Sequence, residues 1–181
     1  MIRKSMMLAL AAWPGALMAQ AAPVESIDQT EILPELNASN VVPVLKVVTG
    51  NHVTSLDSDL NHFITATATN GLRFDVRFHG CEDPKAENID KMQCRALSLV
   101  ALWEPRGDAA VMNPVIADFL YKNPLANAGM LPDGSIYMTR YIIADYGIAQ
   151  GNLLSEMANF VRTATDFTNT VNRTGAAATE K

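Results

Sequence analysis

Apolar and polar positions alternate most clearly between residues 63 and 79. Residues 63–69 alternate and are rich in β-branched side chains, as is typical of a strand, and Asn70-Gly71 follows them at once. Asn-Gly is the strongest short signal for a two-residue hairpin turn, because both turn residues need a positive φ. Residues 72–78 then place apolar side chains on one face and charged ones on the other. The pattern predicts two antiparallel strands that each bury one face.

Helical spacing and turn residues organise the rest of the chain. Ser39 or Asn40 can cap a first helix that Gly50 ends, and Asn113-Pro114 begins a second one. Residues 94–103 are apolar on both sides, which favours a central strand. The complete prediction is a helix at 41–49, strands at 52–56, 63–69, 72–78 and 94–103, a helix at 113–122, strands at 125–131 and 136–144, and a helix at 152–168. This order, α-β-β-β-β-α-β-β-α, indicates an α+β fold with a single antiparallel sheet and flanking helices.

The first 21 residues have the three parts of an export signal. Arg3 and Lys4 precede an apolar run at 6–18, and Ala19-Gln20-Ala21 offers small residues to a signal peptidase. The run is shorter than the roughly 20 residues that a membrane-spanning helix needs. We expect cleavage after Ala21 and a periplasmic or secreted protein. The alternative is the N-terminus of a cytosolic protein.

Three segments follow the predicted signal peptide. Residues 22–38 are acidic and aperiodic, and we expect them to form a partly ordered leader. Residues 39–168 have the length and the apolar content of one domain. Residues 169–181 are small and polar with almost no apolar content, which predicts a disordered tail.

The net negative charge of the chain argues against some classes of binding partner. The whole chain has a formal net charge of −5, and loss of Arg3 and Lys4 with the signal peptide would take it to −7. An acidic domain without a basic cluster is not typical of a protein that binds nucleic acid or anionic lipid. No segment after the signal is apolar for long enough to predict stable insertion in a membrane.

Cys81 and Cys94 are the only cysteines, and an even count in an oxidising compartment favours a disulfide. One would end a strand and the other would begin the next, so antiparallel pairing would bring them together. In a cytosolic protein the pair would instead be free core thiols. With His79 the two thiolates could also bind zinc or copper, or form a Cys–His nucleophile. A disulfide removes both chemistries, and we expect no metal and no cofactor.

Several short sequence segments, together with the order of the predicted elements, resemble the YbjN family of bacterial sensory transduction regulators. The resemblance covers residues 40–167. The segments that most resemble the family are residues 72–81, 94–97, 113–123, 133–138, 147–148 and 152–153. It implies a fold similar to that of the type III secretion chaperones, which often dimerise. It also implies a regulatory or chaperone-like role, and it carries over no catalytic residue. Many relatives look cytosolic, whereas this chain has an export signal.

Two pairs of residues are candidates for a partner-binding surface. Arg73 and Arg77 flank Asp75 on the polar face of one strand, where they could bind an anion or form cross-strand charge pairs. Tyr137 and Tyr141 share one face of another strand and could line a groove or pack in the core. We therefore predict an exported, non-enzymatic protein that binds a protein or peptide, a homodimer being one form of this. The alternative is a metal or small-ligand protein that uses His79, Cys81 and Cys94.

Overall fold

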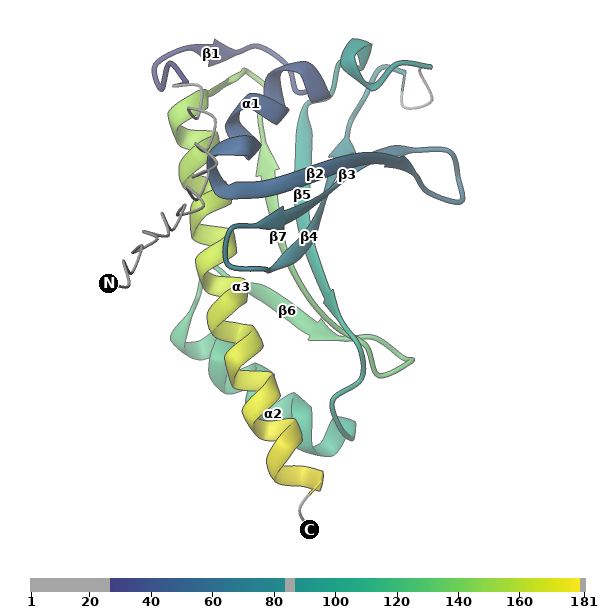
Figure 1. The fold of residues 1–181 in the computed structure, drawn as a ribbon, viewed down its shortest axis with the longest axis vertical. Coiled ribbons are helices and arrows are strands. Elements are labelled where there is room, and N and C mark those ends of the chain that lie inside the picture. The colour runs from purple at the N-terminus through teal and green to yellow at the C-terminus, as the bar shows by residue number, and fades with distance from the viewer. Residues whose placement is uncertain (1–26, 84–86, 180–181) are drawn as a thin grey trace, which may run out of the picture.

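A computed structural model describes residues 27–83 and 87–179, with side chains through Thr174 (Figure 1). The predicted signal peptide, residues 1–21, lies outside the described residues together with its cleavage site, and so do residues 22–26 of the leader. The described residues form an α+β fold, as predicted, in which helices lie against an antiparallel sheet.

Six strands form the main sheet in the order β2-β3-β4-β5-β7-β6, and every neighbouring pair is antiparallel. β5 lies between β4 and β7, which confirms the predicted central strand. A turn at Asn70-Gly71 joins β3 to β4, but it is not the predicted two-residue type. Ala68 donates to the carbonyl oxygen of Leu72, so residues 69–71 form the loop, and within it only Gly71 has a positive φ, of 88°. The strands are β2 (Thr49–Leu56), β3 (His62–Ala68), β4 (Arg73–His79), β5 (Ala96–Trp103), β6 (Asn127–Met130) and β7 (Ile136–Ile143).

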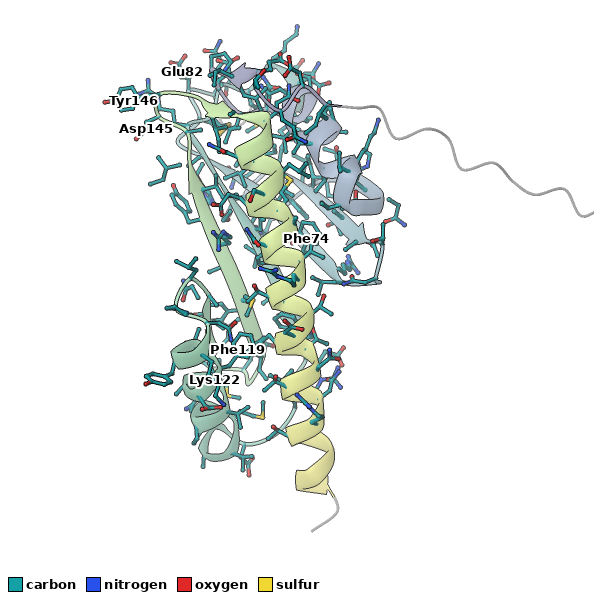
Figure 2. All side chains as sticks on the ribbon, turned by 90° about the vertical axis from the view of Figure 1, so that its left-hand side faces the viewer. Phe74, Glu82, Phe119, Lys122, Asp145 and Tyr146 are labelled. Atoms are coloured by element: carbon teal, nitrogen blue, oxygen red, sulfur yellow. A yellow bond between two sulfur atoms is a disulfide. The ribbon has the colours of Figure 1, made fainter. Side chains whose placement is uncertain are left out.

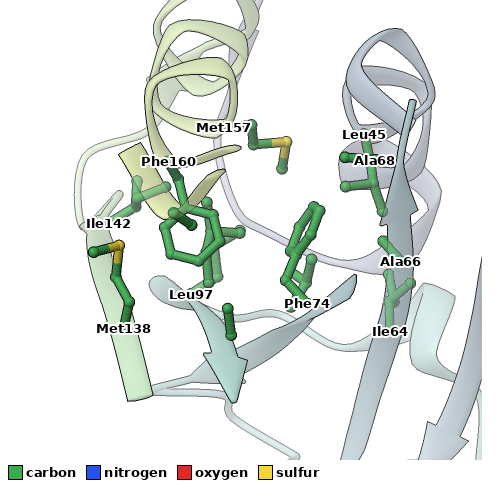
Figure 3. Packing of buried hydrophobic residues seen from close by; sticks show 14 of the residues in the cluster. Leu45, Ile64, Ala66, Ala68, Phe74, Leu97, Met138, Ile142, Met157 and Phe160 are labelled. Carbon is green, nitrogen blue, oxygen red and sulfur yellow. The ribbon is translucent and has the colours of Figure 1, made fainter. Parts of the chain in front are cut away.

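The α-helices of the described residues lie on one face of this sheet, and they are α1 (Ala38–Val48), α2 (Ala109–Lys122) and α3 (Gln150–Thr179). Figure 1 shows α1 beside the first half of α3, and Figure 2 shows α2 beside its second half. The apolar face predicted for residues 72–78 is the buried one, as Phe74 and Val76 on β4 illustrate, and on β7 the buried face is that of Met138. Phe74 packs edge-on against Phe160 of α3, with 5.6 Å between the ring centroids (Figure 3).

The cap of α1 differs from the prediction. Asn37, and neither Ser39 nor Asn40, is the N-cap residue, and its side chain accepts the backbone N–H of Asn40 at 3.1 Å. The side chain of Asn40 in turn accepts the backbone N–H of Asn37 at 3.0 Å. This reciprocal capping box needs two acceptor side chains three residues apart, so the second asparagine serves the first turn and cannot itself be the cap.

The structure adds a second, two-stranded sheet to the single sheet that we predicted. In it β1 (Ile32–Leu33) pairs antiparallel with β8 (Ile148–Ala149). Residues 27–38 of the predicted leader therefore belong to the fold, and Leu33 and Leu36 are buried in the core. Strands of two residues are too short to produce a periodic pattern, which is why the sequence did not reveal them.

The prediction of a disordered tail from residue 169 is wrong for residues 169–179, because α3 continues to Thr179. Buried apolar residues recur along the helix at spacings of three and four, at Phe160, Ala164, Phe167 and Val171. The apolar stripe therefore extends beyond residue 168, where we predicted the helix to end. Threonine hydroxyls in this part of the helix donate to backbone carbonyls four residues earlier, as Thr168 does to Ala164 at 2.7 Å. The carbonyl groups of the helix therefore accept hydrogen bonds from the polar side chains whose presence led us to predict a disordered tail.

Candidate functional site

The main sheet has an open face, opposite the α-helices. Strand register places Phe63, Arg77, Ser98 and Tyr141 side by side across β3, β4, β5 and β7. Alternation along each strand assigns the remaining side chains of this face. The open face comprises Asn51, Val53, Ser55, Phe63, Thr65, Thr67, Arg73, Asp75, Arg77, His79, Ala96, Ser98, Val100, Leu102, Tyr137, Thr139, Tyr141 and Ile143. All four predicted surface residues, Arg73, Arg77, Tyr137 and Tyr141, therefore lie on one face.

Exposed apolar side chains distinguish the open face. The exposed fractions are 63 % for Val53, 56 % for Leu102, 58 % for Tyr141 and 63 % for Ile143. Of the two readings of the tyrosines, core packing is wrong for Tyr141. Leu102, Tyr141 and Ile143 lie on the neighbouring strands β5 and β7, whereas Val53 lies on the edge strand β2. Single exposed apolar residues are common, but several on neighbouring strands are typical of an interaction surface.

Tyr137 is half-buried because its ring lies over the neighbouring strand. It pairs with Gly129 of β6, and a Cβ at Gly129 would lie 2.8 Å from the tyrosine hydroxyl oxygen. The glycine therefore makes room for the ring, and any larger residue would displace it. Tyr137 thus forms a fixed, flat border of the open face, whereas Tyr141 projects from it.

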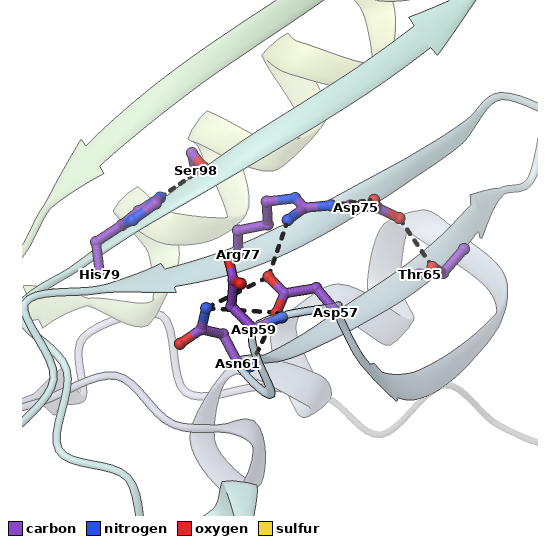
Figure 4. A network of polar contacts seen from close by, with 8 residues as sticks. All are labelled: Asp57, Asp59, Asn61, Thr65, Asp75, Arg77, His79 and Ser98. Atoms are coloured by element: carbon purple, nitrogen blue, oxygen red, sulfur yellow. Dashed lines mark hydrogen bonds and ion pairs between the residues drawn. The ribbon is translucent and has the colours of Figure 1, made fainter. Parts of the chain in front are cut away.

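Charge pairs occupy the middle of the open face (Figure 4). The guanidinium of Arg77 lies 3.4 Å from the carboxylate of Asp75 and 3.6 Å from that of Asp57, and it stacks over the ring of Phe63. The Thr65 hydroxyl donates to Asp75 at 2.8 Å. One carboxylate lies on the same strand and the other in the turn after β2, so the charge of Arg77 is compensated by pairs that do not run across neighbouring strands, and Arg77 is not a free anion site.

Asp57 is fixed by the turn between β2 and β3. Its carboxylate accepts the backbone N–H groups of Asp59 and Asn61 at 3.0 and 2.9 Å. The hydrogen bond from the Asn61 backbone is the largest reason why the pKa of this carboxyl is lowered, and burial opposes it. Asp57 therefore stays ionised at neutral pH and holds Arg77 in place.

The side chains of His79 on β4 and Ser98 on β5 are in contact on the open face. His79 Nε2 lies 2.8 Å from Ser98 Oγ, and the imidazole packs at 5.3 Å against the ring of Tyr141. Burial, and then the positive charge of Arg77, lower the pKa of His79, so the imidazole is neutral at pH 7. The His79 ring, which is hydrogen-bonded to Ser98, therefore supports the Tyr141 ring.

Cys81 and Cys94 form the predicted disulfide, with their Cα atoms 3.9 Å apart. Backbone hydrogen bonds from Arg95 to His79 and from Glu82 to Gln93 continue the pairing of β4 and β5 on both sides of the bridge. Bonded sulfurs cannot act as thiolate ligands, so the alternative metal site of His79 with the two cysteines is wrong for this structure. Among residues 27–83 and 87–179 no group of three His, Cys, Asp or Glu side chains could hold a metal ion.

Comparison with family models, with curated proteins and with solved structures finds no match to the chain. The resemblance to the YbjN family therefore stays a prediction. A disulfide is compatible with an oxidising, exported location. Within the part of the chain that the structure describes, no helix is both long and apolar enough to cross a membrane.

Proposed function

We propose that the chain is an exported, non-enzymatic protein that binds another polypeptide through the open face. The observation that carries this proposal is the exposure of Val53, Leu102, Tyr141 and Ile143 on a sheet face that the described helices leave uncovered. Burying such side chains against a partner contributes roughly 25 cal/mol for each Å² of apolar surface removed from water.

The chemistry of the open face indicates what the partner presents. Tyr141 rests on the His79–Ser98 pair, so its ring is already oriented, and little side-chain entropy is lost on binding. Arg73 is exposed and makes no ion pair with a described residue. A polypeptide with apolar side chains beside a carboxylate would match both features.

The element order supports a regulatory or chaperone-like role. α1, β2 to β5, α2, β6, β7 and α3 follow the order on which the resemblance to the YbjN family rests. The disulfide agrees with an exported version of such a protein. The predicted signal peptide provides the route of export.

Site-directed photo-crosslinking tests the proposal. A benzoylphenylalanine at position 102 reports on the open face, and the same residue at position 125 is the control, since Leu125 is an exposed side chain on the loop after α2. We expect position 102, and not position 125, to capture a partner from a periplasmic extract under oxidising conditions. Tyr141→Ala should reduce that capture, while Tyr121→Ala, which alters an exposed tyrosine of α2, should not.

Two results would contradict the proposal. Equal capture at positions 102 and 125 would show that contact is non-specific. No capture at position 102, together with a monomeric mass in solution, would leave the open face without a polypeptide partner. A crosslinked dimer of the chain itself would identify the partner as a second copy.

A further inference from the structure

A cavity of about 270 Å³ lies on the helix side of the sheet, between β7, α3 and the segment after α2. It forms where β6 begins at Asn127, because beyond Thr139 no strand among the described residues pairs with β7 on this side. The cavity uses no residue of the predicted partner surface. Its volume lies just below the roughly 300–1,000 Å³ of most small-molecule pockets, which indicates a small ligand.

Apolar side chains form part of the cavity lining, beside polar and charged ones. Met138 of β7 and Phe160 of α3 are both buried core residues, and Ala126 adds a third apolar side chain. A well-hydrated inorganic ion gains nothing from these side chains, whereas an apolar group of a ligand does.

The rim of the cavity is cationic. Lys122, Arg140 and Arg162 line it, and no lining residue is acidic, although the chain as a whole carries a net charge of −5. Lys122 pairs with Asp118 at 2.6 Å, and Arg140 pairs with Glu156, both of which lie outside the lining.

Arg162 makes no ion pair with a described residue, and its one hydrogen bond goes to the neutral Asn159 amide oxygen at 2.9 Å. The lining and its partners therefore carry one uncompensated positive charge, which matches a monoanion.

Arg140 is held ready to donate. Its Nε donates to Glu156 of α3, and its Nη1 lies 3.5 Å from the carbonyl oxygen of Leu125. Nη2 has no hydrogen-bond partner among the described residues. A guanidinium that is fixed on two sides loses little entropy when it binds a carboxylate.

We propose that this cavity binds a small carboxylic acid with a short apolar tail. The tail lies against Met138 and Phe160, and the carboxylate accepts from Arg162 and Arg140. The apolar side chains select against inorganic anions, and the single uncompensated charge selects for a monocarboxylate. This site shares Thr139 with the open face but none of the four residues predicted to bind a partner, and it does not rest on the function proposed for that face.

Octanoate below its micellar concentration is the probe. In protein labelled with methyl-¹³C methionine, octanoate should shift the Met138 methyl resonance and leave Met92 and Met112 unchanged, because these two are core residues outside the cavity lining. Acetate lacks the tail and octylammonium has the wrong charge, so each should bind at least tenfold more weakly than octanoate.

Paired variants on one helix separate the site from general charge effects. Arg162→Gln should weaken octanoate binding about tenfold, as loss of a charge-assisted hydrogen bond does. Arg173→Gln, which removes an exposed arginine three turns further along α3, should leave binding unchanged. Ala126→Leu fills part of the cavity and should weaken binding with all charges intact, provided that its thermal unfolding matches that of the wild type.

An unchanged Met138 resonance with saturating octanoate would overturn the proposal. Equal weakening by Arg162→Gln and Arg173→Gln would do the same, since the effect would then depend on net charge alone. Equal binding of octylammonium would show that the cavity takes apolar tails without regard to charge. None of these results bears on crosslinking at position 102.

Discussion

Removal of the Cys81–Cys94 disulfide should lower the free energy of unfolding by about 3 kcal/mol. The two cysteines are 13 residues apart, and constraining an unfolded loop of this length contributes about that much in the chain-entropy model. The native fold should survive the loss. Backbone hydrogen bonds between Leu36 and Cys94 do not depend on the bridge, and Ile89 and Met92, within the loop that the bridge closes, are buried in the core. Small domains are typically stable by about 5–15 kcal/mol, so the reduced protein should remain folded in water.

Urea unfolding with and without reductant measures the effect. Trp103 packs edge-on against Phe167, at 5.4 Å between ring centroids, so its fluorescence reports on the contact between β5 and α3. With a slope of about 2 kcal/mol per M urea, the expected loss moves the unfolding midpoint down by about 1.5 M. Thiol titration of the unreduced protein should find no free thiol. An unchanged midpoint after verified reduction, or two free thiols in the unreduced protein, would refute the reasoning.

Three further predictions concern the core, the open face and α3. Phe74→Ala should cost about 3–5 kcal/mol in urea unfolding, because it leaves a cavity beside Phe160. The lowered pKa of His79 means that the unfolded chain binds its proton more readily, so stability should fall as the pH drops below about 6.5. If urea unfolding midpoints are measured over a series of pH values, His79→Gln should reduce the dependence of the midpoint on pH in that range. Val171→Ala should cost about 2 kcal/mol, whereas a disordered tail would give no loss.

The hairpin and the sheet could be predicted because local signals and packing agree there. Asn70-Gly71 fixes a turn, and the alternation through residues 72–78 decides which side of β4 is buried. Gly50 shows the limit of such signals. We read it as a left-handed helix stop, but no positive φ occurs there, and the strand register shifts between Thr49 and Asn51. A glycine suits a bulge as well as a helix end, and only the neighbouring strand decides between them.

The candidate surface was only partly predictable. Alternation placed Tyr137 and Tyr141 on one side of β7 but left open whether that side packs in the core, and the structure shows that it is the outer one. Leu102 was missed because β5 is apolar on both faces, and such a pattern indicates a central strand without showing which face is exposed. β5 is central within the sheet, but the described helices cover one face only. The cavity could not be predicted, since residues 122–126, 138–140 and 159–163 meet through packing alone.

β7 belongs to both proposed sites, and its pleat keeps them apart. Tyr141 points to the open face, while Met138 and Arg140 point to the helix side and reach the cavity. Because the two sites share a strand but no proposed contact side chain, substitutions in one should leave the free energy of binding at the other nearly unchanged. Any measured coupling would have to pass through the backbone of β7, and residues 140–143 have a strand neighbour on the β5 side only. A partner that tightened this segment would change octanoate affinity without touching the cavity, so failure of additivity between Tyr141→Ala and Arg162→Gln would locate the connection in β7.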